Sequence, residues 1–186
     1  MDLFVSFYKL FSLDFFGFVE SMNQVPILVS WLFFLVVCLL TILFLLRLFG
    51  EVGIFIYTVI AIISANIQVL KIIEFPFFSN PIALGTILFS STFLATDILT
   101  EYYGSKVARK NILIGFVSFL IMTLFMLFTI GFTPLDAKNV DDELSWALLI
   151  QDYLMGIFMP FPSFFIASMI AFLISQYFDV WLFEKI

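Results

Sequence analysis

Residues 25–48 read VPILVSWLFFLVVCLLTILFLLRL, an apolar run whose only charged residue is Arg47. The hydrocarbon core of a bilayer requires about 20 consecutive apolar residues for a helix to cross it. The run has that length, and it is followed by the polar pair Gly50 and Glu51. We therefore predict a transmembrane helix with a polar exit over residues 25–48.

The composition of the whole chain agrees with this segment. Apolar residues make up 63% of the 186 residues and charged residues only 12%, whereas soluble domains average about 45–50% and about 25%. This excess lies in long runs, which favours several membrane crossings. The predicted fold class is all-α, a polytopic helical membrane protein.

Four more transmembrane helices are predicted beyond the first. Pro160 and Pro162 kink or start the last of them, since proline interrupts a helix or occupies its first turn. The phenylalanine-rich amino terminus, residues 1–20, lacks a basic start and a cleavage site, so we interpret it as an interfacial helix. The later spans are expected at about residues 53–71, 82–102, 112–132 and 146–178.

These spans divide the chain into three parts. Residues 1–24 form an amino-terminal interfacial segment, residues 25–48 a first transmembrane helix, and residues 52–186 a helical core. Within that core the span over residues 112–132 has no polar feature, so we expect it to face lipid.

The basic residues predict the orientation, because short cytoplasmic loops carry the excess of Lys and Arg. Lys106, Arg109 and Lys110 place the loop over residues 104–111 in the cytoplasm, with Arg47 and Lys185 on the same side. The expected location is the inner cell membrane, in a multi-pass arrangement.

Several function classes have little support. The chain has no histidine, and Cys38 is its only cysteine, so imidazole catalysis and thiolate metal sites are excluded. We read Cys38 as a small buried hydrophobe. No nucleophile paired with a base and no phosphate-binding glycine loop occurs. We expect no enzymatic activity, no cofactor and no nucleic-acid partner.

Polar residues at membrane depth are the candidates for a binding site, because lipid cannot satisfy them. Alternatives remain open for each: Glu101 could pair with Lys106 and Asp97 with Arg109 at the membrane surface, and the amides could join neighbouring helices. Ala61 and Ala65 would allow such a close helix approach. The candidate substrate-binding residues are Asn66, Gln68, Asp97, Glu101, Gln176 and Asp179.

Three motifs occur in order along the chain. They are SANIQVLK at residues 64–71, FLATDILTEYYGSKVARK at residues 93–110, and AFLISQYFDV at residues 171–180. Together they resemble the queuosine precursor transporter family, also called the vitamin uptake transporter family. The resemblance covers about residues 53–184, and the middle motif is its most specific part.

The resemblance implies a six-span helical bundle that imports 7-deazaguanines for tRNA modification. A guanine-like edge offers neighbouring N–H donors that a carboxylate accepts as a pair. The implied partners are a small purine-like substrate, the lipid bilayer, and either a second copy or a partner membrane subunit. Family members continue with further helices after the last motif, so we expect the carboxyl-terminal helices to be missing after Ile186.

Two other functions remain open. One is a substrate-binding membrane subunit of a multi-subunit vitamin importer, which co-purification with an ATPase would favour. The other is a truncated membrane protein that transports nothing, whose polar residues only hold helices together.

Overall fold

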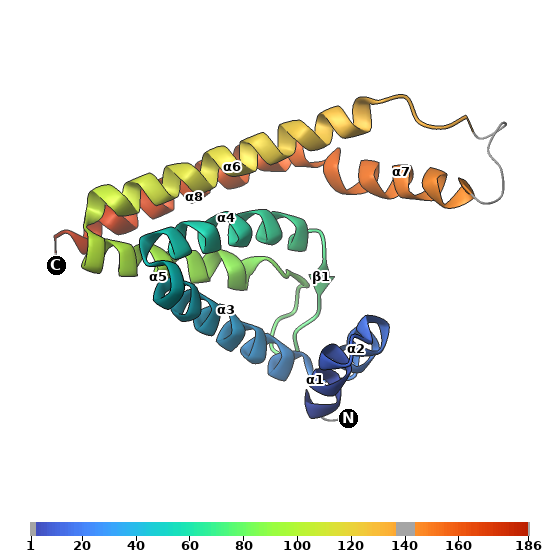
Figure 1. Ribbon diagram of the computed structural model, residues 1–186, viewed down its shortest axis with the longest axis horizontal. Coiled ribbons are helices and arrows are strands. Elements are labelled where there is room, and N and C mark those ends of the chain that lie inside the picture. Colours follow the sequence, from blue (N-terminus) through green and yellow to red (C-terminus); the bar gives the residue numbers. More distant parts are fainter. Residues whose placement is uncertain (1–2, 137–143, 186) are drawn as a thin grey trace.

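The computed structural model describes residues 3–136 and 144–185 (Figure 1). Helices account for nearly all of the regular structure, which confirms the predicted all-α class. The elements are α1 (Leu3–Phe11), α2 (Phe15–Asn23), α3 (Ile27–Phe49), α4 (Glu51–Gln68), β1 (Ile72–Ile73), β2 (Ile82–Ala83), α5 (Thr86–Tyr103), α6 (Ser105–Gly131), α7 (Ser145–Phe158) and α8 (Phe161–Phe183).

Three helices of the described part, α3, α4 and α6, are long and apolar enough to cross a membrane. Helix α3 matches the predicted first span closely, and most of its surface is exposed, as expected for a helix in contact with lipid. The chain is therefore a helical membrane protein. Helix α5 is not among the three, because hydroxyl and carboxyl side chains interrupt its apolar sequence.

Helix α4 lies at the centre of the bundle and packs against α3, α5 and α6 (Figure 1). Its side chains Ile54, Ile62 and Ala65 are completely buried, and Ala61 is almost so. The small side chains permit close approach: a Cβ added at Gly85, where α5 begins, would lie 2.5 Å from the carbonyl oxygen of Ala65. The structure shows the predicted close approach of a neighbouring backbone at Ala65.

Helices α6 and α8 run side by side in opposite directions along the other flank of the bundle (Figure 1). The turn between α3 and α4, the turn between α5 and α6, and the carboxyl terminus all lie at one end. Gly50 and Gly104 form these two turns with positive φ angles of 59° and 87°, which glycine adopts without a steric penalty. The predicted cytoplasmic basic residues are thus gathered at one end.

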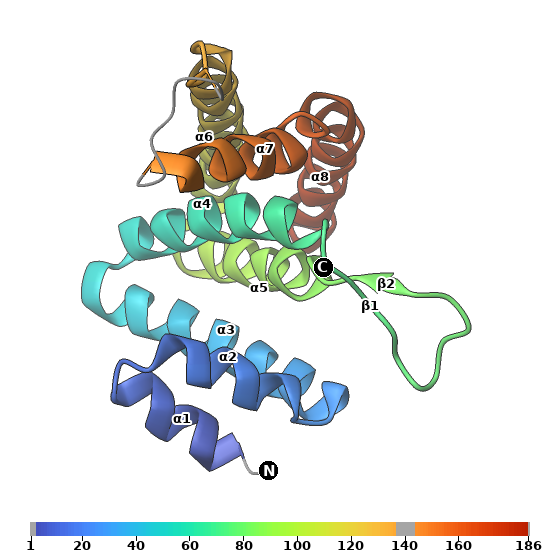
Figure 2. The same cartoon turned by 90° about the vertical axis from the view of Figure 1, so that its right-hand side faces the viewer.

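The opposite end differs from the prediction in two ways. The amino terminus forms two short helices rather than one, because Leu13 adopts a φ of 62° and Asp14 then caps α2 by accepting a hydrogen bond from Gly17. Helix α4 stops at Gln68, and the chain continues into the antiparallel β1–β2 hairpin. Figure 2 shows the α1–α2 pair against α3 and the hairpin extending from the ends of α4 and α5.

The fourth span also differs from the expectation. Helix α6 begins at Ser105, about two turns earlier than predicted, and it buries Ala108, Asn111 and Gly115 against its neighbours. Phe119 and Thr123 are buried as well, so the prediction that this helix only faces lipid is wrong as far as Thr123. The basic residue Lys138 of the predicted outer loop lies outside the described residues.

Candidate functional site

Helices α5 and α8 meet along a strip of polar side chains that we call the polar seam: Thr92, Thr96, Asp97, Gln176 and Asp179. Gln176 is completely buried. Its Nε2 donates a hydrogen bond to Thr92 Oγ1 at 2.9 Å, and its Oε1 accepts one from Thr96 Oγ1 at 2.8 Å. The amide therefore joins the two helices and has both of its polar atoms paired.

One turn farther along, the seam places two carboxyl groups side by side. Asp97 of α5 and Asp179 of α8 lie close enough to interact directly, and Oδ2 of Asp179 is buried without a hydrogen-bond partner. Asp97 lies about 9 Å from the end of α5 at Tyr103, at about 1.5 Å per residue. The seam thus holds one buried acceptor atom, Oδ2 of Asp179, that the protein leaves unused.

Asn66 lies at the contact between α4 and α8. Its Nδ2 donates to the carbonyl oxygen of Ile62 at 2.8 Å, and its Oδ1 accepts from Ser168 Oγ at 3.3 Å. Both polar atoms of the amide are paired within the protein. The geometry fits a side chain that joins helices, which is the alternative reading of this amide.

Two further polar contacts were not predicted. Asn111, completely buried in α6, donates from Nδ2 to Thr58 Oγ1 at 2.9 Å, and its Oδ1 has no partner. Tyr57 and Ser91 share a buried hydrogen bond between α4 and α5. Asn111 was missed because the basic residues just before it suggested a loop.

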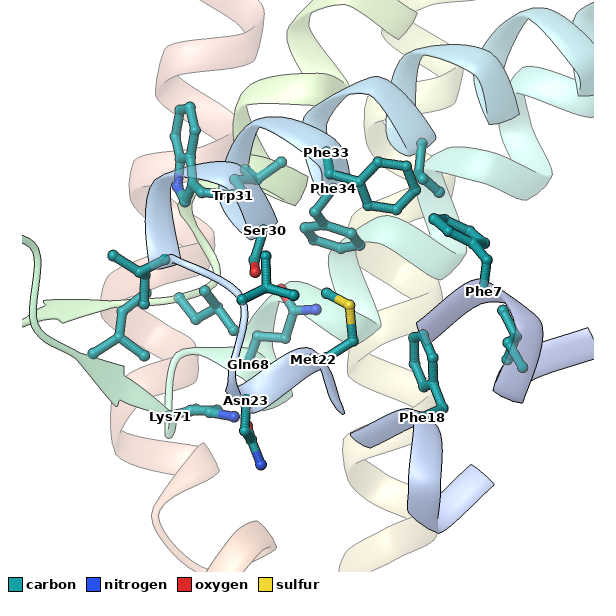
Figure 3. A pocket seen from close by; sticks show the side chains of 17 residues that line it. Phe7, Phe18, Met22, Asn23, Ser30, Trp31, Phe33, Phe34, Gln68 and Lys71 are labelled. Carbon is teal, nitrogen blue, oxygen red and sulfur yellow. The ribbon is translucent and has the colours of Figure 1, made fainter. Parts of the chain in front are cut away.

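The six predicted residues do not form one cluster. Asp97, Gln176 and Asp179 come together in the seam, and Asn66 lies apart from them on α4. Glu101 is exposed. Gln68 lies at the hairpin end, where its Oε1 is buried without a partner and the residue lines a separate cavity next to α1, α2 and α3 (Figure 3).

The proposed pairing of Asp97 with Arg109 does not occur. Arg109 instead forms an ion pair with Glu184 at 2.6 Å, which connects the start of α6 to the end of α8. The arginine is thus engaged elsewhere, and the seam acids face each other. Two like charges side by side are unfavourable, so a ligand that offers hydrogen-bond donors would relieve their repulsion.

A bundle of apolar helices with a strip of polar side chains between α5 and α8, in which Asp97 and Asp179 are partly buried, defines a polytopic membrane protein. Residues 83–186 match the family model described as "Putative vitamin uptake transporter". A protein of Bacillus subtilis strain 168 named "Probable queuosine precursor transporter" is 31% identical over 156 residues. This chain belongs to the vitamin uptake transporter family, also called the queuosine precursor transporter family.

The match with the Bacillus protein includes 84% of this chain and 63% of the relative's length. No solved structure matches the chain. The polar seam lies within the region matched by the family model, whereas α1 to α4 precede it.

Proposed function

We propose that this chain takes part in the import of a small purine-like molecule across the inner cell membrane. The Asp97–Asp179 pair is the observation that carries the proposal. The threonines and Gln176 beside it are already hydrogen-bonded to each other, so the carboxyl oxygens are the atoms left to bind a solute.

The chemistry of these acceptors favours a guanine-like edge. Such an edge presents a ring N–H and an exocyclic amino group as neighbouring donors, and a carboxylate accepts the two together. The name of the Bacillus subtilis relative points to queuosine precursors. The proposed substrates are 7-cyano-7-deazaguanine, 7-aminomethyl-7-deazaguanine or queuine, which serve tRNA modification.

Each predicted residue receives a role in this proposal. Asp97 and Asp179 accept the N–H donors of the substrate, and Gln176 fixes the spacing of α5 and α8. Asn66 contributes along the path at the α4–α8 contact, and exposed Glu101 lies at the cytoplasmic exit, four residues after Asp97. Gln68 binds the substrate at the opposite end of the bundle, beside the β1–β2 hairpin.

The proposed arrangement in the membrane follows from the charges. Gly104 and the first two turns of α6, residues 105–111, face the cytoplasm, where Lys106, Arg109 and Lys110 are favoured. Residues 1–24 lie at the outer interface, residues 25–48 cross the membrane, and residues 52–186 form the transporting core.

Uptake of labelled 7-aminomethyl-7-deazaguanine tests the proposal directly. The chain is expressed in cells that lack both their own importer and the synthesis of this base, and queuosine is measured in their tRNA. Restored queuosine is the expected result. Its absence from cells whose membranes contain the chain at the level of a working importer would contradict the proposal that this chain transports by itself.

A further inference from the structure

A second site lies outside the seam, at the end of the bundle that carries the β1–β2 hairpin. A cavity of about 580 Å³ opens there between the α1–α2 pair, α3 and the end of α4. Its volume is within the range of about 300 to 1,000 Å³ that is typical of pockets for small molecules. Figure 3 shows side chains from all of these helices turned toward it.

Two oxygen atoms in this cavity are buried and have no hydrogen-bond partner: Ser30 Oγ on α3 and Gln68 Oε1 on α4. In an apolar helix a hydroxyl usually bonds to the backbone of the preceding turn, as Thr41 does here with the carbonyl oxygen of Val37. Ser30 does not do so. Buried polar atoms are normally paired, so both oxygens are suited to receive a ligand's donors.

The remaining walls of the cavity are mainly aromatic and aliphatic. Phe33 packs edge-to-face on Phe7, with ring centroids 4.9 Å apart, and this contact connects α1 to α3. Trp31 and Phe34 line the same space. Flat aromatic walls favour stacking with a planar ring, whereas the two oxygens select for N–H or O–H groups on its edge.

We propose that this cavity is a binding site for a planar heteroaromatic base, with Gln68 and Ser30 accepting its N–H groups between aromatic walls. Lys71 and Asn23, on the side of the cavity away from Trp31 in Figure 3, supply donors for a carbonyl oxygen on the ring. The identity of the base as a purine-like compound rests on the proposed function. The site itself is built largely from α1, α2 and α3, which precede the region matched by the family model.

The cavity and the seam lie at different levels of the bundle. Ile87, in the first turn of α5, lines the cavity, whereas Asp97 lies about 15 Å farther along the helix at about 1.5 Å per residue. The turns with the basic residues are at the other end. The cavity therefore receives the base at the outer side before the base reaches the acids.

Tryptophan fluorescence tests the site, because Trp31 lines the cavity whereas Trp146 and Trp181 are 61% and 48% exposed elsewhere. The full chain carrying Trp146→Phe and Trp181→Phe retains Trp31 as its only tryptophan. Purified in detergent, it is titrated with 7-aminomethyl-7-deazaguanine. We expect saturable quenching of Trp31.

Two substitutions in this background show whether the oxygens bind the base. Gln68→Leu and Ser30→Ala should each weaken binding at least tenfold, since each removes one acceptor. Gln151→Leu and Ser79→Ala, at positions outside the cavity, are the matched controls and should leave the titration unchanged. Each variant is compared at equal amounts of folded protein, judged by gel filtration.

Saturable quenching that Gln68→Leu and Ser30→Ala weaken supports the site, whether or not the chain restores queuosine in cells. If the chain restores queuosine but the base does not quench Trp31, the proposed cavity site is wrong, whereas the proposed transport is unaffected. Quenching that neither substitution changes also overturns it. Quenching by a brominated fatty acid that the base does not displace would assign the cavity to lipid and overturn the proposal.

Discussion

The carboxyl groups of Asp97 and Asp179 form either a binding site or a structural contact between helices, and substitutions distinguish the two roles. If the pair binds substrate, Asp97→Asn or Asp179→Asn removes the charge that accepts two N–H donors. We expect uptake to fall at least about tenfold, equivalent to about 1.4 kcal/mol. Thermal stability in detergent should stay the same or rise, because each substitution removes a like-charge contact and binding sites are often held at a cost in stability.

Asp152→Asn is the matched control for these acids, since Asp152 is exposed on α7. It should change neither uptake nor stability. Lower stability with normal uptake in the Asp97 and Asp179 variants would mean that the pair only holds α5 and α8 together.

For Gln176 we expect a substitution to lower stability, because both of its polar atoms bond to Thr92 and Thr96. Gln176→Leu leaves two buried hydroxyls without their partner on α8. Hydrogen bonds between membrane helices contribute about 0.6 to 2 kcal/mol, so we expect a loss of about that size in unfolding free energy. Unfolding in mixed micelles with increasing denaturing detergent measures it, and an unchanged unfolding curve would contradict the helix-joining role.

At the scale of the elements, the contact between α4 and α5 depends on Gly85. A Cβ at this position would meet the backbone oxygen of Ala65 at 2.5 Å, and a backbone atom cannot move aside as a flexible side chain can. Gly85→Ala should therefore separate the start of α5 from α4 and lower the thermal midpoint by several degrees. Gly156→Ala is the control, since its Cβ would have no neighbour within 4 Å; it should be neutral or stabilising.

The lengths of the apolar runs were sufficient to predict most of these elements. Helix α3 agrees with its run almost to the residue, because lipid-facing helices are specified by length and apolarity alone. Helix α4 was predicted to begin and end two to three residues too late, and α6 was predicted to begin seven residues too late. The β1–β2 hairpin and the burial of Asn111 depend on contacts between distant residues, which the pattern of one segment does not contain.

The candidate site was predicted less completely than the helices. Periodicity placed Gln176 and Asp179 on one face of their helix, and α5 then supplied Asp97 opposite them. The separation of Gln68 from Asp97 follows from the predicted spans, because residue 68 lies near the outer end of one span and residue 97 near the inner end of the next. The cavity around Gln68 could not be foreseen, because it depends on the early end of α4 and on the packing of α1 and α2.

At the scale of the whole molecule, the orientation in the membrane decides what each end can do. The bundle gathers its short basic turns at one end and the hairpin at the other (Figure 1). Labelling of introduced cysteines tests this orientation. In a Cys38→Ala background, which removes the only natural cysteine, Ser79→Cys places a thiol in the hairpin loop and Lys110→Cys places one beside the basic turn.

A membrane-impermeant maleimide applied to intact spheroplasts should label the Ser79→Cys variant at once and the Lys110→Cys variant only after permeabilisation, because positively charged loops stay in the cytoplasm. The reverse pattern would show that the molecule has the opposite orientation in the membrane. Lys71, just before the hairpin, and Ile73, in β1, line the aromatic cavity, so the same experiment fixes its side of the membrane. An outward cavity would capture the base before the Asp97–Asp179 pair, whereas an inward cavity would hold it after passage and slow its release.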